Sequence, residues 1–214
     1  MSPRGRYIPA LRFHWLTTLY DPLVERWSAA ASIRKLVVNA LDLHPQSRLL
    51  EVGCGSGRLA IEIKQRLPQI SIHAIDADPR VIQVAEQNAR QAQAQIHFGV
   101  VDITQFGDQM KFDRIYSTLV FHHLTPSDKA RALEKIRAVL EPSGKFVVAD
   151  FSRPQGLAQS LLFYLAQLLD GFERTNPHRN SGFEQQLAQS FRTVVTVRRL
   201  QTAFGTVGIF ICEP

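Results

Sequence analysis

The fold is decided by the stretch Leu49-Leu-Glu-Val-Gly-Cys-Gly-Ser-Gly-Arg-Leu-Ala60. An apolar run that suits a buried strand ends here in a glycine-rich turn and passes into a helical pattern. Gly53, Gly55 and Gly57 allow positive φ angles and the close approach of a ligand to the backbone. The helix N-terminus that follows favours an anionic group, such as a carboxylate. The stretch therefore predicts a strand, a turn and a helix that together bind a small ligand.

The residues after this stretch alternate short strand patterns with helical patterns, which is typical of βαβ units and a parallel sheet. We expect strands at Arg48–Val52, Ser71–Ile75, Gln95–Gly99, Phe112–Ser117 and Lys145–Asp150, and helices at Leu59–Leu67, Pro79–Ala92 and Ser127–Leu140. Asp78 stands before Pro79, as expected of an N-cap followed by a first-turn proline. The order predicts an α/β fold with a doubly wound sheet and right-handed crossovers.

Both flanks differ from that alternation. Residues 11–43 suggest two helices broken at Asp21-Pro22, and residues 155–170 and 182–190 suggest two more. The runs Thr193–Leu200 and Ala203–Cys212 are close enough to form an antiparallel hairpin. We therefore expect one domain over residues 1–214, with a helical N-terminal lid (1–43), a cofactor-binding core (45–151), a helical cap (152–192) and a terminal hairpin (193–214).

The composition is that of a soluble globular protein, with 214 residues, 45% of them apolar and 21% charged. No apolar stretch approaches the roughly 20 residues that span a bilayer. No secretory signal is visible, so we expect a cytoplasmic protein. Cys54 and Cys212 make neither a disulfide framework nor a four-ligand zinc site, and no metal is expected.

The formal net charge of +6 comes from the flanks. Residues 1–35 carry six basic and two acidic groups, residues 151–214 carry six and four, and the middle block is neutral. Such flanks can steer an anionic substrate, a membrane surface or a nucleic acid. A merely solubilising surface fits the modest excess equally well. The charge alone therefore selects no partner.

Three acidic residues follow the successive strands. Asp76 stands nineteen residues after Gly57 at the end of the second strand, where a carboxylate can accept both hydroxyls of a ribose. Glycines and acid at this spacing also satisfy the looser pattern of NAD enzymes. Glu51 ahead of the glycines suits a cationic group, and Asp102 after the third strand suits an adenine amino group. These two acids and the terminal hairpin argue against NAD.

The order of the motifs resembles that of class I S-adenosylmethionine-dependent methyltransferases. The matching segments are E-x-G-x-G-x-G from Glu51, Ile75-Asp-Ala-Asp-Pro79, Val101-Asp-Ile103, Phe112-Asp-Arg-Ile-Tyr-Ser-Thr-Leu-Val-Phe-His-His-Leu124 and Leu140-Glu-Pro-Ser-Gly-Lys-Phe-Val-Val-Ala-Asp150. Within that superfamily the chain is similar to the small-molecule ubiquinone/menaquinone C-methyltransferase group. The resemblance implies a Rossmann-like seven-stranded sheet, mostly parallel, with S-adenosyl-L-methionine as cofactor. It leaves the acceptor open.

The resemblance also implies a set of cofactor-binding residues. Glu51, Gly53 and Gly55, with Cys54 in the same turn, would contact the methionine part of the cofactor. Asp76 would hold the ribose, and Ala77 would pack near the adenine. Asp102 and the backbone N–H of Ile103 would read the adenine edge. The backbone at Thr118 would help to hold the methionine amino group, and Tyr20 would close over the cofactor.

His122 and His123 are the candidate catalytic residues. A hydroxyl acceptor needs a base, and a histidine can serve as one near neutral pH. The pair follows the fourth strand, close to the expected site. A structural role, such as capping the following loop, is the competing interpretation. The remaining histidines, at positions 14, 44, 73, 97 and 178, have no metal-ligand spacing between them.

The acceptor is expected to be a soluble small molecule, apolar or aromatic, selected by the flanking helices. Peripheral membrane contact stays open, because basic and amphipathic stretches coincide near the N-terminus. A nucleic-acid methyltransferase is the alternative, although Ser117-Thr-Leu-Val-Phe-His122 lacks the Asn/Asp-Pro-Pro-aromatic motif of enzymes that act on flipped bases. An NAD-dependent oxidoreductase and a non-catalytic cofactor-binding subunit are further alternatives. The sequence leaves the acceptor atom and the oligomeric state undetermined.

Overall fold

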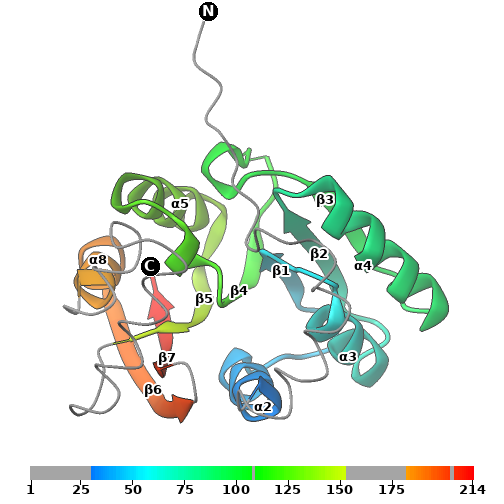
Figure 1. Ribbon diagram of the computed structural model, residues 1–214, viewed down its shortest axis with the longest axis horizontal. Coiled ribbons are helices and arrows are strands. Elements are labelled where there is room, and N and C mark those ends of the chain that lie inside the picture. Colours follow the sequence, from blue (N-terminus) through cyan, green and yellow to red (C-terminus); the bar gives the residue numbers. More distant parts are fainter. Residues whose placement is uncertain (1–29, 108, 153–181, 203–204) are drawn as a thin grey trace, which may run out of the picture.

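The computed structural model describes residues 30–107, 109–152, 182–202 and 205–214. Its centre is a seven-stranded sheet in the order β3-β2-β1-β4-β5-β7-β6 (Figure 1). The strands are β1 (Arg48–Val52), β2 (Ser71–Asp76), β3 (His97–Val100), β4 (Phe112–Thr118), β5 (Leu140–Phe151), β6 (Thr193–Thr202) and β7 (Gly205–Glu213). Strands β1 to β5 are parallel, and β7 pairs antiparallel with both β5 and β6. The predicted sheet and terminal hairpin are confirmed.

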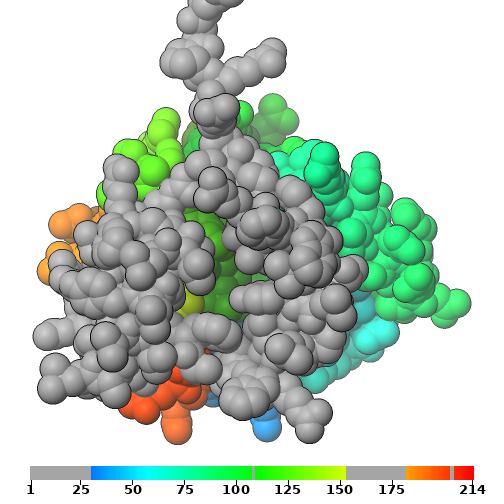
Figure 2. All heavy atoms as spheres, viewed as in Figure 1, coloured from blue at the N-terminus to red at the C-terminus, as the bar shows by residue number. Residues whose placement is uncertain are grey.

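Helices cover both faces of the sheet (Figure 1). The α-helices are α2 (Ala30–Leu41), α3 (Arg58–Arg66), α4 (Pro79–Gln91), α5 (Pro126–Val139) and α8 (Gly182–Ser190), and the short 3₁₀ helices are η2 (Ile103–Gln105) and η3 (Phe121–His123). Asp78 caps α4 as expected, since its Oδ1 accepts a hydrogen bond from the backbone N–H of Arg80 at 2.8 Å. Figure 2 shows α4 and α5 at the surface, with atoms from the green part of the chain, which contains β4, at the centre of this face.

Two apolar clusters hold these layers together. One face of the sheet packs Leu50, Ile115 and Val148 against α5 and α8, which contribute Leu133 and Phe183. The opposite face packs other strand residues against α2 and α3, among them Leu49, Ile72, Tyr116, Val147 and Ile209. Successive strand residues point to opposite faces, so a sheet covered on both sides needs nearly continuous apolar strands. That requirement explains the strong strand patterns of the middle block.

The largest boundary difference is in β5, which begins at Leu140 and not at Lys145. Leu140 pairs with Phe112 and Lys145 pairs with Arg114, so the register shifts between these two pairs. The segment Pro142-Ser-Gly is therefore an irregularity within the strand, since β5 pairs with β4 on both sides of it in two different registers. Within the described ranges, no helix is long and apolar enough to cross a membrane.

Candidate functional site

The predicted site residues meet at the carboxyl edge of the sheet. Glu51 lies near the end of β1, Asp76 ends β2 and Thr118 ends β4. Strand β1 pairs with β2 on one side and with β4 on the other, so the chain order reverses there. In open α/β sheets such a switch point opens a crevice in which ligands bind. The topology thus places the glycine turn, which joins β1 to α3, at this switch point (Figure 1).

The glycine turn is anchored to the end of β2. The backbone N–H groups of Gly53 and Cys54 donate to the Ile75 carbonyl at 2.8 and 3.0 Å. Gly53 has φ +73°, and a Cβ added there would stand 2.2 Å from Val120 Cγ2. Gly55 has φ +53°, and an added Cβ would meet no atom of the described residues within 4 Å. Gly53 therefore lets the end of β1 approach Val120, which follows β4. Gly55 leaves its backbone uncovered by the described residues.

Asp76 joins the glycine turn to the start of α4. Its Oδ2 accepts a hydrogen bond from the Gly55 N–H at 3.1 Å, and its Oδ1 accepts one from the Asp78 N–H at 3.1 Å. Burial raises the pKa of Asp76, and these backbone hydrogen bonds act in the opposite direction. Each carboxylate oxygen keeps further lone pairs, so the group can accept from an incoming pair of hydroxyls.

Glu51 is a buried carboxyl group with 4% of its surface exposed. Burial raises the pKa of Glu51 to about 8, with the nearby Tyr116 hydroxyl acting against this and the charge of Asp76 adding to it. Among the described residues, neither Glu51 Oε2 nor the Tyr116 hydroxyl has a partner that meets hydrogen-bond geometry. A buried carboxyl oxygen that no described residue satisfies can complete its hydrogen bonds with a cationic group of a ligand.

The remaining predicted site residues at the carboxyl edge of the sheet are Asp102, Ile103 and Thr118. Asp102 Oδ1 accepts hydrogen bonds from the Thr104 N–H at 2.9 Å and from its hydroxyl at 2.8 Å, which caps η2. The Ile103 side chain is buried in the core. Thr118 Oγ1 is buried without a hydrogen-bond partner in the described part of the chain. Ala77 is exposed beside Asp76. Tyr20 lies outside the described residues.

His122 is buried, with 6% of its surface exposed, and its Nδ1 lies 3.0 Å from Asp150 Oδ1. Asp150 Oδ2 accepts hydrogen bonds from the backbone N–H groups of Val120 and Phe121 at 3.0 and 2.7 Å. Asp150 therefore fixes both the turn after β4 and the ring of His122. The His123 ring contacts that of His122, with centroids 3.9 Å apart.

Sequence reasoning missed Tyr116, Lys129 and Asp150. Asp150 ended a predicted strand at the same edge as Asp76, so its place after β5 was the available signal. No pattern in the sequence marked Lys129 or Tyr116 as a site residue. Lys129 falls in a helical pattern, and Tyr116 falls in an apolar strand.

His73 and His97 are far apart in the sequence but lie close together in the sheet. The register of β2 and β3 places them opposite each other, and their rings stack with centroids 4.8 Å apart. The part of the chain that the structure describes contains no group of three or more His, Cys, Asp or Glu residues arranged to hold a metal ion.

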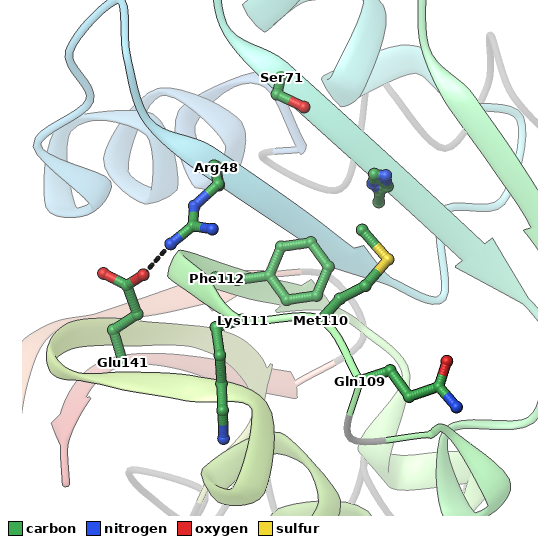
Figure 3. A pocket seen from close by; sticks show the side chains of 8 residues that line it. Arg48, Ser71, Gln109, Met110, Lys111, Phe112 and Glu141 are labelled. Carbon is green, nitrogen blue, oxygen red and sulfur yellow. Dashed lines mark hydrogen bonds and ion pairs between the residues drawn. The ribbon is translucent and has the colours of Figure 1, made fainter.

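A pocket of about 380 Å³ lies at the opposite, amino edge of the sheet, and Figure 3 shows its lining. Arg48 pairs there with Glu141. Lys111 points away from Phe112 in this view, and its Nζ donates to the Ala138 carbonyl. The cationic groups that line the pocket are thus engaged within the protein. It is separate from the glycine turn.

Comparisons with known proteins identify the family of the chain. Residues 49–144 match the model of a methyltransferase domain. A demethylmenaquinone methyltransferase of Deinococcus radiodurans is 30% identical over 68% of this chain and 58% of that protein. A ubiquinone/menaquinone biosynthesis C-methyltransferase of Geotalea daltonii is 30% identical over 72% of this chain and 67% of that protein. The chain therefore spans 58% to 67% of these relatives' own lengths.

A solved structure with the same fold is the magnesium protoporphyrin IX methyltransferase of Synechocystis with bound S-adenosylhomocysteine. It has a TM-score of 0.67 and 17% sequence identity, and the match covers 98% of this chain and 90% of that one. At this identity the likeness concerns the fold. Together with the matches in sequence, it shows that the chain belongs to the class I S-adenosylmethionine-dependent methyltransferases, in the group of the ubiquinone/menaquinone C-methyltransferases.

Proposed function

We propose that this chain transfers a methyl group from S-adenosylmethionine to a small, apolar or aromatic acceptor that carries a hydroxyl group. The observation that carries the proposal is the orphaned Oε2 of Glu51, buried at the switch point beside the open backbone of Gly55. A buried carboxyl oxygen without a partner is costly unless a ligand completes it. The amino group of the methionine part is a ligand of suitable charge.

The other residues of the edge fit the rest of the cofactor. Asp76 is positioned to accept the ribose hydroxyls, with Ala77 exposed beside it for the adenine ring. Asp102 uses Oδ1 to cap η2, which leaves Oδ2 for the adenine amino group. The backbone of Thr118 and the N–H of Ile103 would complete the contacts. The roles of Cys54 and Tyr20 in binding stay predictions.

When bound, the cofactor supplies a methyl carbon attached to a sulfonium, which an acceptor atom displaces in line. The protein has to align the two and exclude water. A phenolic ring becomes nucleophilic at oxygen or carbon once its hydroxyl loses a proton. We assign that proton to His122, which Asp150 orients through Nδ1. His123, in contact with the same ring, is the second candidate base.

The names of the relatives support an aromatic ring acceptor of the quinol type. Both relatives described above are named as quinone-pathway methyltransferases, and one is named as acting on carbon. An aromatic ring with a hydroxyl would need the base that the His122–Asp150 pair provides. The same pair could also deprotonate an acceptor that is methylated at oxygen. An experiment therefore has to identify the acceptor atom.

Calorimetric titration with S-adenosylmethionine, S-adenosylhomocysteine and NAD(H) tests the cofactor. We expect the two sulfur compounds to bind the unchanged protein, and Asp76→Ala to weaken them about 100-fold or more, since two charge-assisted hydrogen bonds are each worth about 1.5–3 kcal/mol. Glu86→Ala is the matched control, because its side chain is partly exposed on α4 and, among the described residues, pairs with Arg90 alone. Binding of NAD(H) alone would overturn the proposal.

Methyl transfer to a panel of quinols, phenols and amines then tests the reaction. Labelled S-adenosylmethionine supplies the readout, and His122→Gln is compared with the unchanged protein on each acceptor. We expect turnover on a hydroxylated aromatic ring and its loss by about 100-fold or more in the variant, the usual size of a general-base contribution. Cofactor binding with no turnover on any acceptor would instead indicate a binding subunit.

A further inference from the structure

The glycine turn between β1 and α3 has positive φ angles at Gly53, Gly55 and Gly57. Glycine adopts left-handed and right-handed backbone conformations about equally readily, so a turn with three glycines has several conformations of similar energy. Contacts from outside the turn therefore have to select the conformation that receives a ligand. For the first half of the turn these contacts come from β2, through the Ile75 carbonyl and the Asp76 carboxylate.

The second half of the turn contacts helix α4. The side-chain Nδ2 of Asn88 donates a hydrogen bond to the Ser56 carbonyl at 3.0 Å. About one helical turn earlier, Ala85 faces Gly57, since a Cβ added at Gly57 would stand 3.1 Å from Ala85 Cβ. Residues three apart lie on the same side of a helix, so one face of α4 makes both contacts. Helix α4 therefore supports Ser56 and Gly57 as β2 supports the first half.

The hydrogen bond from Asn88 fixes the orientation of the peptide between Ser56 and Gly57. In a planar trans peptide the C=O and the N–H point in opposite directions. With its carbonyl directed at Asn88, this peptide directs the Gly57 N–H the other way, where it donates to the Cys54 carbonyl at 2.9 Å. Gly57 is also the N-cap residue of α3, with φ +73°. The closure of the turn and the start of α3 thus depend on which way this peptide faces.

The residue type and the placement of α4 both suit this task. A carbonyl oxygen only accepts hydrogen bonds, and the amide of Asn88 supplies a donor without adding a charge. The start of α4 is itself fixed at the carboxyl edge of the sheet, because the Asp78 N–H donates to Asp76 Oδ1 at 3.1 Å. Helix α4 therefore connects Asp76, which we assign to the ribose, with the turn that we assign to the methionine part.

We propose that Asn88 is a positioning residue for cofactor binding, whose amide holds the Ser56–Gly57 peptide in the orientation that lets the glycine turn receive the methionine part of S-adenosylmethionine. The inference rests on the proposed function, in which this turn contacts the methionine part. Asn88 acts through the Ser56 carbonyl and not through the cofactor. Without the amide, the glycines allow the peptide to turn over, and only the molecules that keep the original turn bind at full affinity.

Titration calorimetry with S-adenosylhomocysteine measures the effect on affinity. We expect Asn88→Ala to weaken binding about fivefold, the population shift that corresponds to one neutral hydrogen bond of ordinary net strength. Asn88→Asp should weaken binding further, because a carboxylate cannot donate and repels the Ser56 carbonyl. Gln87→Glu adds the same charge at an exposed position of α4 and should leave the affinity unchanged. Ile136→Val, which costs stability in the core under α5, should leave it unchanged as well.

Amide hydrogen exchange, followed by NMR without any ligand, measures the turn itself. In Asn88→Ala we expect the Gly57 N–H to exchange about fivefold faster or more, because the open form of the turn becomes more populated. The Ile82 N–H, which donates to the Asp78 carbonyl at 3.1 Å in the first turn of α4, should keep its rate. In the unchanged protein, the side-chain amide of Asn88 should exchange more slowly than that of the exposed Gln87.

Two results would overturn the proposal. One is a folded Asn88→Ala protein that binds S-adenosylhomocysteine as tightly as the unchanged protein, or in which the Gly57 and Ile82 amides accelerate equally, since Asn88 would then only stabilise α4. The other needs no variant, which covers the case that Asn88→Ala does not fold. It is an unchanged protein whose Asn88 and Gln87 side-chain amides exchange equally fast. Absence of S-adenosylhomocysteine binding to the unchanged protein would instead refute the proposed function, and the Gly57 exchange would still test whether Asn88 anchors the turn.

Discussion

Glu51 on β1 lies directly opposite Tyr116 on β4, and both side chains are buried on the same face of the sheet. The pair joins the two strands that form the switch point. Burial raises the pKa of Glu51 to about 8, so the free protein carries a protonated carboxyl group at neutral pH. A cationic ligand group would favour the ionised form. Binding and proton release should therefore be coupled at this residue.

We expect S-adenosylmethionine to release about one proton from Glu51 on binding at pH 7, because the bound amino group stabilises the carboxylate. Titration calorimetry in buffers of different ionisation enthalpy measures this release. Glu51→Gln should bind more weakly and lack that part of the release. Comparing the two proteins cancels any proton from the ligand itself. Equal release from both would contradict the assignment.

Glu51 should also limit stability at alkaline pH. Its folded-state pKa lies above the unfolded value of 4.5, so the folded protein holds the extra proton. The contribution of Glu51 to folding stability therefore falls as the pH rises from about 4.5 to about 8. We expect ligand-free Glu51→Gln to melt about 3 °C or more above the unchanged protein at pH 8.5, which corresponds to about 1 kcal/mol for a chain of this size. At pH 4.5 the difference should shrink.

Gly53→Ala should destabilise the protein by about 2 kcal/mol or more. Its φ of +73° disfavours a side chain, and the new Cβ would stand 2.2 Å from Val120 Cγ2. The double variant with Val120→Ala should regain part of the loss, since the steric conflict is relieved and the backbone strain persists. Urea denaturation of the three variants measures both effects. A double variant as unstable as the sum of the singles would exclude the contact with Val120 as the cause.

Asp102 should discriminate the adenine ring. We expect Asp102→Ala to weaken S-adenosylhomocysteine about tenfold, and to weaken an analogue that lacks the adenine amino group much less, because only the amino group donates to the carboxylate. Asp102 Oδ1 also accepts from the Thr104 hydroxyl at 2.8 Å. Thr104→Ala is therefore the control for altered η2 geometry. If Thr104→Ala weakens the binding of S-adenosylhomocysteine and of the analogue as strongly as Asp102→Ala does, the loss of affinity comes from altered η2 geometry.

Helix α8 should support the turn that carries His122. Phe183 of α8 is buried against Phe121, with ring centroids 5.1 Å apart. We expect Phe183→Ala to lower the free energy of unfolding by about 3–5 kcal/mol, because a large cavity opens in the core. The exposed Gln185→Ala on the same helix should change it by less than about 0.5 kcal/mol. Chemical denaturation compares the two variants, and a small effect of Phe183→Ala would show that α8 contributes little to the core.

Much of the fold could be predicted from the sequence because local patterns determine it. Alternating strand and helix patterns gave the five parallel strands, and Asp78-Pro79 marked the start of α4. The glycine turn could be predicted because its backbone geometry favours glycine. Asp76 could be predicted because it stands at the end of a strand. The start of β5 was mispredicted, because Pro142-Ser-Gly is a local turn signal that the pairing of Leu140 with Phe112 overrides.

The sequence by itself determined the order of the elements, the glycine turn and the acidic residues that follow the strands, since these depend on neighbours along the chain. Only the tertiary structure decided what surrounds them. It set Tyr116 opposite Glu51, stacked His73 on His97, and brought Asp150 to His122. Those relationships depend on strand register and helix packing, which join residues far apart in the chain. Burial then raises the pKa of Glu51 and lowers that of Lys129, because removing a group from water penalises its charged form.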